Sequence, residues 1–450
     1  MPFTADARAP TSYEIGGGKL PRRLGPWSTA AVTVGMMIGS GIFRVPAQAA
    51  AETGSPGAML LAWVIGGIVA MSGALALAEV AARYPEAGGM YVYLREAFGP
   101  LTAFLFGWVY LIVIPAGVGA IALVFAEYLG RLLSLSAGSV RPVAAVTIVL
   151  LAAAQYRSLR AGALIQNLST GAKVAAILAL AAAAFLLTGG GTGAWSAPAA
   201  PHPSIWSGLG LGVVTVLWAY NGWQDVTCLS GEVLDPQRTL PRAIVGGTLC
   251  VVAVYLAANA AYLRVLPIAE VAGSPLVAAD VAVRLVGPAG AALVSALVCL
   301  ATFGSLNAVI MAIPRVFWAM ADDGLFFRSV AAIHPRYRTP HVAITALAAL
   351  AVVYLALQSF EHLIEAFILA SLPFWALSVA SVFVLRRRQP TTPGAYRTPG
   401  YPVVPAFFIV AMAALLLNSL RLHPEATLTA LGAIVAGVPL YYGWRSRRRR

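Results

Sequence analysis

Charged residues are scarce in this sequence. Asp, Glu, Lys and Arg make up only 10% of its 450 residues, whereas a soluble domain carries roughly 25%. Apolar residues make up 60%, and the mean hydropathy is +0.81. This composition excludes an ordinary soluble domain and predicts a protein that crosses a membrane many times.

Cysteines and catalytic motifs are also few. Cys228, Cys250 and Cys299 all fall within apolar runs, so no disulfide framework is expected. The first 25 residues include Asp6, Glu14 and a glycine run but no apolar core, so we expect no cleaved signal peptide. The histidines are scattered without metal-ligand spacing. Because phosphate-binding loops, Gly-x-Ser-x-Gly motifs and catalytic carboxylate pairs are also missing, we expect neither an enzyme nor a bound metal or cofactor.

Long apolar runs fill most of the chain. A helix needs about 20 apolar residues to cross a bilayer. About twelve runs meet this requirement, near 27–49, 57–82, 100–130, 141–156, 161–187, 204–231, 243–264, 288–320, 341–358, 362–385, 402–420 and 426–444. The pattern predicts an all-α membrane protein with about 12 transmembrane helices.

Positive charge is distributed unevenly among the loops between these runs. With the N-terminus inside, the inner segments hold 22 Lys and Arg residues, the outer loops hold five, and three lie within runs or at their ends. By the positive-inside rule, we expect the tails 1–25 and 445–450 to be cytoplasmic. The net charge of +13 therefore reflects membrane topology and not a nucleic-acid partner. The final segment RSRRRR is interpreted as an anchor beside anionic lipid headgroups of the bilayer.

Two apolar runs are interrupted near their middle. In GMMIGSGIFRVP, residues 35–46, the small residues Gly-Ser-Gly at 39–41 stand where a helix should be strongest. Each glycine weakens a helix interior by roughly 1 kcal/mol relative to alanine. In VVTVLWAYNGWQDVTCLSGEV, residues 213–233, the pair Asn-Gly at 221–222 has the same position. At 1.5 Å per residue, both interruptions fall about 20–25 Å along their helices, near the middle of a bilayer.

The two interrupted runs are five spans apart and run in opposite directions. This arrangement predicts a five-plus-five inverted repeat, with halves at 26–187 and 204–385 and two appended helices in 402–444. Paired broken helices at corresponding positions indicate a transporter site. The alternative is that Gly35 and Gly39 form a small-xxx-small pattern for close helix packing.

Unwinding the first interrupted helix would free backbone N–H groups. Those of Gly41, Ile42 and Phe43 would carry the positive end of a helix dipole, which suits a carboxylate. Ser40 can add a hydroxyl, and the glycines at 39 and 41 let a ligand approach the backbone closely. We therefore expect an anion-binding site at this break.

Free carbonyl groups would lie opposite this anion site. They would come from Met37 and Ile38 in the first helix and from Trp218, Ala219 and Tyr220 in the sixth. Such carbonyls suit a cation such as an ammonium group. A carboxylate site and an ammonium site a few ångströms apart predict an α-amino acid as ligand.

Other side chains near the second break have alternative roles. Trp218 and Tyr220 lie too deep for an interfacial belt, so we expect them to line or cap the ligand cavity. Trp223 fits a place in the cavity and a place in the packing equally well. Asp225 falls where a residue capping the next half-helix would sit, with proton carriage as the alternative.

Lys173 is the most informative charge in the spans. The chain has 28 arginines and only two lysines, and this lysine lies about 12 residues into the fifth run. Snorkelling to the interface is one interpretation, but the depth of roughly 18 Å makes it a long reach. The hypothesis we prefer is that its ammonium tethers the unwound carbonyls of helix 1, and it could also carry a proton. Glu79 and Arg315, near the inner ends of their runs, either pair or snorkel.

Five motifs follow one another along the chain. They are GMMIGSGIF at 35–43, PEAGGMYVYLREAFGP at 85–100, WAYNGWQDVTCLSGEVLDPQRTLPRAI at 218–244, RVFWAMADDGLFFRSVAAIHPRYRTP at 315–340 and PGAYRTPGYPVVP at 393–405. In this order they resemble the amino acid–polyamine–organocation superfamily, and within it the L-type amino acid transporter branch and its bacterial relatives. The resemblance implies a twelve-helix inverted-repeat fold and transport by alternating access.

The resemblance also implies roles for residues at both breaks. It places the substrate carboxylate at Ser40, Gly41 and Ile42. It places the amino group at carbonyls around four residues, Ile38, Trp218, Ala219 and Asn221. Lys173 matches the lysine in helix 5 of that branch, which stands where sodium sits in sodium-coupled relatives. The resemblance therefore implies sodium independence.

Two features depart from the family pattern. Trp218 stands where the helix 6 motif often begins with Phe. The loop RLLSLSAGSVR, residues 131–141, lacks the cysteine by which animal members bind an ancillary subunit, so we expect no disulfide-linked partner.

Together these features predict a sodium-independent transporter of neutral L-amino acids in the inner membrane of a bacterium. We expect it to work as an exchanger, with proton-coupled symport as the alternative. A carrier of polyamines or cationic amino acids, and an amino-acid sensor, are less favoured.

Overall fold

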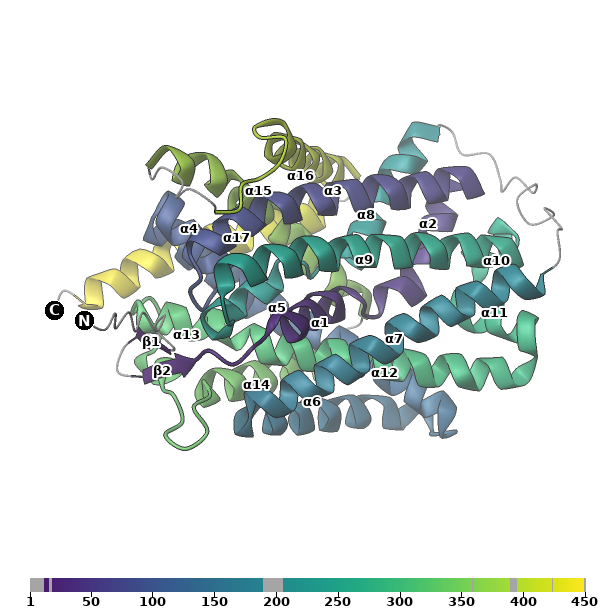
Figure 1. Cartoon of the computed structure of the whole chain (residues 1–450), viewed down its shortest axis with the longest axis horizontal. Helices are drawn as coiled ribbons and strands as arrows, with labels where there is room; N and C mark the ends of the chain where they lie inside the picture. The colour runs from purple at the N-terminus through teal and green to yellow at the C-terminus, as the bar shows by residue number, and fades with distance from the viewer. Residues whose placement is uncertain are drawn as a thin grey trace, which may run out of the picture.

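The computed structural model describes residues 12–15, 18–188, 205–357, 360–388, 395–422 and 424–448. These residues form an all-α bundle whose helices run roughly along the long axis of the molecule (Figure 1). The expected fold class is confirmed. One short antiparallel hairpin, β1 (Ser12–Ile15) with β2 (Gly18–Pro21), precedes the bundle and was not predicted within the tail 1–25.

The first five spans begin with a broken helix. Proline at the first helical position starts several of these helices, where its missing N–H costs nothing. Ser55 and Ser158 cap two of them, accepting hydrogen bonds from the backbone N–H groups of Ala58 and Ala161. The elements are α1 (Pro26–Met37), α2 (Gly41–Thr53), α3 (Pro56–Arg83), α4 (Met90–Phe98), α5 (Pro100–Leu132), η1 (Ala137–Ser139), α6 (Val140–Arg157) and α7 (Leu159–Leu187).

The next five spans also begin with a broken helix. Its first part is an α-helix and its second part is a 3-10 helix. The elements are α8 (Ile205–Tyr220), η3 (Asp225–Glu232), α9 (Pro236–Val265), α10 (Ile268–Gly273), α11 (Val277–Val286), α12 (Pro288–Ala312), α13 (Pro314–Asp322), η4 (Arg328–Ala331), α14 (His341–Leu357) and α15 (Phe360–Arg388). Two more helices, α16 (Val403–Leu422) and α17 (Pro424–Arg448), complete the chain.

Ten helices within the described ranges are long and apolar enough to cross a membrane. They match ten of the twelve runs expected from sequence. The remaining two are the sixth run, which stops being α-helical at Tyr220, and the ninth, which has only 17 helical residues in α14. Several leucines on the outer faces of α7 and α9 are exposed, including Leu168, Leu186 and Leu249. Exposed apolar side chains on long helices suit contact with lipid.

The start of the bundle is tied to the second broken helix. Backbone N–H groups of Arg23 and Leu24 donate to the Glu232 carbonyl at 2.7 and 2.9 Å, and the N–H of Leu234 donates to the Leu24 carbonyl at 2.8 Å. Figure 1 shows β1, β2 and the end of α17 at one end of the bundle, here called the hairpin end, with α10 and α11 at the other. The segments before α1 and after η3 therefore lie together, which brings the two breaks side by side.

Candidate functional site

The first break lies between α1 and α2, as expected. Residues 38–40 are not helical. Ser40 is the N-cap of α2 but its side chain makes no capping bond, so its hydroxyl remains available to a ligand. Gly41 and Ile42 are the first residues of α2, where backbone N–H groups have no partner within the helix. The N–H of Phe43 was expected to be free as well, but it donates to the Ser40 carbonyl at 3.2 Å.

The second break lies between α8 and η3. Gly222 has φ +115°, a left-handed backbone conformation that favours glycine. Side chains stabilise this turn: Gln224 Nε2 donates to Asn221 Oδ1 at 2.7 Å, and the N–H of Gly222 donates to Gln224 Oε1 at 3.3 Å. The break predicted at 221–222 is therefore a turn held by its own amide side chains.

The two breaks pack directly against each other. A Cβ atom added at Gly41 would lie 2.7 Å from Ala219 Cα, at the end of α8. A Cβ atom added at Gly222 would lie 2.9 Å from the Met36 carbonyl carbon, at the end of α1. Only glycine permits these approaches. The positive start of α2 and the negative end of α8 thus face one small region of space.

Lys173 is fully buried and bonded to the end of α1. Its Nζ donates to the Gly35 carbonyl at 2.7 Å and to the Ile38 carbonyl at 2.6 Å. Ser305 of α12 lies beside it, with its Oγ 3.2 Å from Nζ and 2.8 Å from each of the same two carbonyls. These are the bonds that the tether hypothesis requires, while the part Lys173 has in transport stays a prediction.

The carbonyls at the end of α1 therefore already have protein donors. Ile38 O accepts from Lys173, and Met37 O accepts from Tyr255 Oη at 2.7 Å. We expected both carbonyls to be available to a substrate ammonium group. The protein uses them to hold its own broken helix, which leaves the end of α8 as the better place for a ligand cation.

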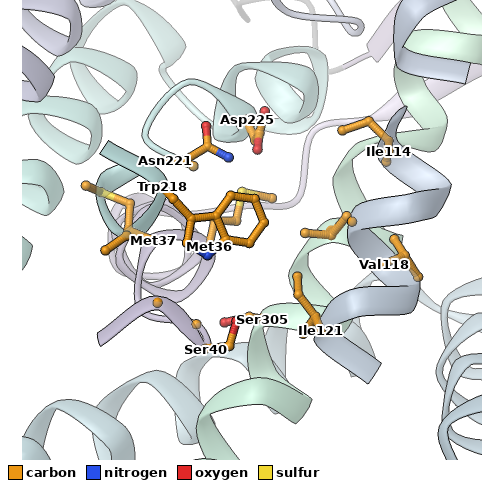
Figure 2. Close-up of a pocket in the computed structure, with 16 residues that line it drawn as sticks. Met36, Met37, Ser40, Ile114, Val118, Ile121, Trp218, Asn221, Asp225 and Ser305 are labelled. Atoms are coloured by element: carbon orange, nitrogen blue, oxygen red, sulfur yellow. The ribbon is translucent and has the colours of Figure 1, made fainter. Parts of the chain in front are cut away.

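A cavity of about 60 Å³ lies at the meeting point of the breaks (Figure 2). This volume exceeds the roughly 10–15 Å³ that a cavity needs to hold one water molecule. Six of the nine residues predicted to bind substrate line it, namely Gly39, Ser40, Gly41, Trp218, Ala219 and Asn221. The sequence therefore located both backbone parts of this cavity.

Three predicted residues lie elsewhere in the described structure. Ile38 and Ile42 are fully buried and do not line the cavity. Tyr220 points towards α3, where its Oη donates to the Trp63 carbonyl at 3.1 Å and its ring meets the Trp63 ring edge-on. Trp223 also turns away, and its ring packs against Phe408 of α16.

Two helices that the sequence did not single out complete the cavity. Helix α5 contributes an apolar wall, and α12 contributes one polar and one apolar residue. Seven lining residues were not singled out from sequence, namely Met36, Ile114, Gly117, Val118, Ile121, Ser305 and Val309, while Met37, Gly222 and Asp225 were named at the breaks but not among the predicted binding residues. One feature of the sequence could have indicated the α5 wall. Gly117 lies two residues after Pro115, in the middle of that helix.

Asp225 faces the cavity and is 5% exposed. It was expected to cap the half-helix after the second break. It is instead the first residue of η3, whose N-cap is Gln224, and no side-chain capping bond is made. A carboxylate in the first turn still interacts favourably with the helix dipole, but capping does not account for this residue.

Ion pairs join the helices near the hairpin end. Arg315 and Glu232 are both 1% exposed and lie 2.8 Å apart, Nε to Oε1. Glu79 pairs with Arg386, whose Nε lies 2.8 Å from Oε1. The expected alternative that Glu79 pairs with Arg315 is therefore wrong, because each has another partner.

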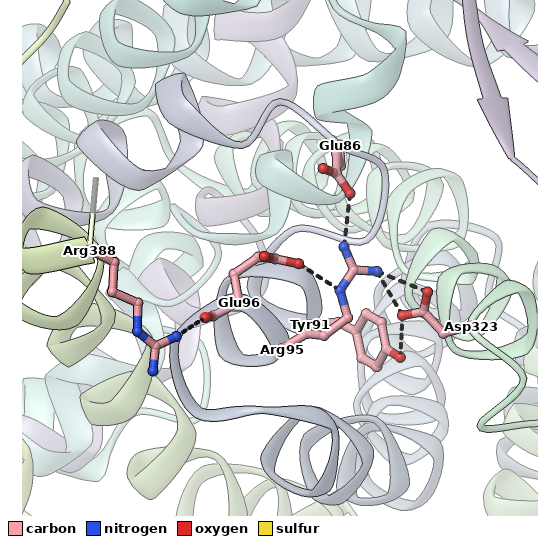
Figure 3. Close-up of polar contacts among 6 residues, drawn as sticks. All are labelled: Glu86, Tyr91, Arg95, Glu96, Asp323 and Arg388. Atoms are coloured by element: carbon pink, nitrogen blue, oxygen red, sulfur yellow. Dashed lines mark hydrogen bonds and ion pairs between the residues drawn. The ribbon is translucent and has the colours of Figure 1, made fainter. Parts of the chain in front are cut away.

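A second ionic cluster ties α4 to the end of α13 (Figure 3). Arg95 of α4 bonds both carboxylate oxygens of Asp323, at 2.9 and 2.7 Å. It also bonds Glu86 at 3.0 Å and Glu96 at 2.9 Å, and Tyr91 donates to Asp323 at 2.8 Å. Elsewhere, Arg44 of α2 pairs with Glu127 of α5. These contacts link elements from different parts of the chain that surround the cavity.

Comparison with known proteins agrees with this architecture. A family model described as "Amino acid permease" matches residues 24–437. The serine/threonine exchanger SteT of Bacillus subtilis (strain 168) is 31% identical over 434 residues, covering 95% of this chain and 98% of that protein. The b(0,+)-type amino acid transporter 1 of Mus musculus is 29% identical over 460 residues, covering 99% and 94%.

A third relative is the large neutral amino acids transporter small subunit 2 of Mus musculus. It is 30% identical over 436 residues, covering 95% of this chain and 82% of that protein. These relatives are amino acid transporters or exchangers, which indicates a transporter and not an enzyme. The chain therefore belongs to the amino acid permease family, a family of multi-pass membrane transporters within the superfamily that its five motifs resemble.

Proposed function

We propose that this protein exchanges neutral L-amino acids across the inner membrane of a bacterium, without sodium and by alternating access. One observation carries the proposal: the N–H end of α2 and the C=O end of α8 meet at a single cavity. An α-amino acid carries a carboxylate and an ammonium group on the same carbon, which suits two helix ends of opposite polarity at one cavity. The name of the SteT relative, a serine/threonine exchanger, supports the exchange mode.

The proposed ligand groups follow from this geometry. The substrate carboxylate accepts hydrogen bonds from the N–H group of Gly41 and from the Ser40 hydroxyl, while Ile42 is left out because it does not line the cavity. The ammonium group binds at the end of α8, near the carbonyls of Trp218 and Ala219. The Trp218 carbonyl also accepts from the N–H of Asn221 at 3.2 Å, and the Asn221 carbonyl stays a further candidate. Ile38 is left out because its carbonyl is bonded to Lys173, and Tyr220 because it does not line the cavity and its side chain points to α3.

Lys173 supports the proposed sodium independence. Its ammonium group bonds two carbonyls of the unwound segment, Gly35 and Ile38. Backbone carbonyl oxygens are also the ligands by which an unwound helix coordinates sodium in other transporters. We propose that Lys173 supplies the positive charge that such an ion would otherwise bring.

The remaining proposals concern topology and partners. We propose two inverted repeats at 26–187 and 204–385, with the tails 1–25 and 445–450 in the cytoplasm, on the charge asymmetry of the loops. Residues 1–11, 189–204 and 449–450 lie outside the described residues. We propose no disulfide-linked subunit, since the loop 131–141 has no cysteine. A complex that is seen on non-reducing gels and that dithiothreitol dissociates would contradict this proposal.

Uptake into proteoliposomes tests the proposed function. Purified protein is reconstituted with or without internal amino acid, and uptake of labelled L-serine, L-threonine, L-leucine and L-arginine is followed in sodium-free buffer. We expect uptake of neutral amino acids that requires internal amino acid and is unchanged by added sodium. Uptake into empty vesicles driven by external acid would instead show proton symport, and a requirement for sodium would contradict the role proposed for Lys173.

A further inference from the structure

A buried carboxyl group lies at the end of the cavity away from Ser40. Figure 2 shows Asp225 and Asn221 at one end of the cavity and Ser40 and Ser305 at the other. The wall between the two ends is apolar where α5 contributes Ile114, Val118 and Ile121. The cavity therefore has two polar ends separated by an apolar middle.

Asp225 has hydrogen-bonding capacity that the protein leaves unused. Its Oδ1 is buried and has no hydrogen-bond partner among the described residues. Buried cations near the breaks point elsewhere: Lys173 bonds backbone carbonyls and Arg315 bonds Glu232. An unpaired buried polar oxygen is costly, so a group that supplies a donor there is bound preferentially.

The position of Asp225 decides which part of a substrate it meets. If the substrate carboxylate lies at Gly41 and the substrate ammonium group at the end of α8, the substrate side chain is the part left to reach Asp225 at the other end of the cavity. The cavity volume of about 60 Å³ favours a short side chain. This step rests on the proposed function, because it uses the orientation given there.

We propose that Asp225 is a specificity-determining residue that accepts a hydrogen bond from a donor on the substrate side chain. The protein then prefers small amino acids whose side chain ends in a donor, above all a hydroxyl group. Threonine and valine are isosteric, so they differ at this site only in whether Asp225 gains a partner. Because hydrogen bonds to a carboxylate are strong when buried, we expect a preference for threonine of about tenfold to a hundredfold.

Competition in exchange assays tests this inference. Exchange of labelled L-serine is measured in sodium-free proteoliposomes with unlabelled threonine, valine or alanine as competitor, for the wild type, Asp225→Leu and Asp225→Asn. In the wild type, threonine should compete at least about tenfold better than valine. In Asp225→Leu the ratio should fall to about one, and in Asp225→Asn, which keeps an acceptor oxygen, it should stay above one.

A cationic competitor keeps the test decisive if Asp225→Leu fails to fold. The short amino acid L-2,3-diaminopropionate carries an ammonium group on its side chain, which a carboxylate binds better than an amide does. It should compete about tenfold less well in Asp225→Asn than in the wild type. Equally strong competition by L-2,3-diaminopropionate in the wild type and in Asp225→Asn would overturn the inference.

Further outcomes separate this inference from the proposed function. A wild type that exchanges threonine and valine equally well would overturn the role of Asp225 and leave amino-acid exchange standing. If Asp225→Asn lowers the exchange of every amino acid by the same factor, the role of Asp225 in specificity is also overturned. Asp225 would then act on the part common to all amino acids or carry a proton. A wild type that exchanges no amino acid would contradict the proposed function itself.

Discussion

Lys173 and Gly41 show how much single residues contribute to this site. Lys173 is an isolated lysine in a chain that otherwise uses arginine, and it bonds the end of α1. Gly41 lies where two backbones touch. Both residues stabilise an irregular backbone in a region where unpaired backbone groups are costly.

Replacing Lys173 with alanine should remove the charged donor to Gly35 O and Ile38 O. We expect exchange to fall at least about tenfold and the free energy of unfolding to fall by about 1–3 kcal/mol, since two buried acceptors are left to share the single Ser305 hydroxyl. Exchange in proteoliposomes and the melting temperature measure the two effects. The control is Arg160→Ala, an exposed basic residue on the same helix, which should change stability by less than about 0.5 kcal/mol. Exchange at the wild-type rate in Lys173→Ala would refute both the tether and proton carriage.

Replacing Gly41 with alanine should push α2 away from α8. Its Cβ would meet Ala219 Cα at 2.7 Å, so the backbone must move, and we expect lower stability together with loss of substrate binding. Gly246→Ala on α9 is the matched control, because a Cβ there meets nothing within 4 Å and alanine favours a helix. Thermal unfolding should separate the two variants. If Gly41→Ala binds substrate and melts like the wild type, the two breaks are not in contact.

The residue types at the breaks could be predicted from sequence, but the directions in which their side chains point could not. Glycine within an apolar run indicated both breaks, and the position of Lys173 within its run indicated how deep its ammonium group lies in the membrane. Ser305, which shares the carbonyls of Ile38 and Gly35 with Lys173, lies 267 residues beyond Ile38, and no local pattern reveals such a contact. Tyr220 faces α3 because the chain unwinds directly after it, and helical periodicity cannot be extended across such a break.

At the scale of elements, buried ion pairs hold the bundle together near the hairpin end. Glu232 at the end of η3 pairs with Arg315 near the start of α13, and both are 1% exposed. Arg95 of α4 bonds Asp323, just after the end of α13. Helix α13 is therefore fixed at both ends by charge pairs to other elements.

Breaking the buried pair should matter far more than breaking an exposed one. Glu232→Gln leaves the Arg315 guanidinium buried without a carboxylate, and we expect a loss of about 3–5 kcal/mol in the free energy of unfolding. The control is Glu270→Gln, whose partner Arg284 is 56% exposed, with an expected loss of at most about 1 kcal/mol. Thermal unfolding in detergent measures both variants. Equal losses would mean that the pair between η3 and α13 does not stabilise the protein.

At the scale of the whole molecule, the sequence predicted the number and order of helices well because lipid imposes a simple rule. A span must satisfy its own backbone, so each appears as a long apolar run. The sixth run departs from the rule for a physical reason, because it unwinds at the site. The walls from α5 and α12 were missed because their residues are apolar or small, like the rest of their spans.

At this scale, two broken helices recognise the amino acid together. The free N–H group at Gly41 requires a carboxylate, and the end of α8 requires an ammonium group. A ligand lacking either group should lose most of its affinity, whatever its side chain. This requirement follows from backbone geometry and does not depend on Asp225.

The most direct test is competition against labelled L-serine by analogues that lack one main-chain group. Serinol, the achiral diol in which a second hydroxymethyl group replaces the carboxylate, lacks the carboxylate, and N-acetyl-L-serine lacks the ammonium group, while both keep the hydroxyl side chain. We predict that unlabelled L-serine competes and that each analogue competes at least about a hundredfold less well, as expected when charged hydrogen bonds are lost. Competition by serinol as strong as by L-serine would contradict the claim that the broken helices bind the substrate.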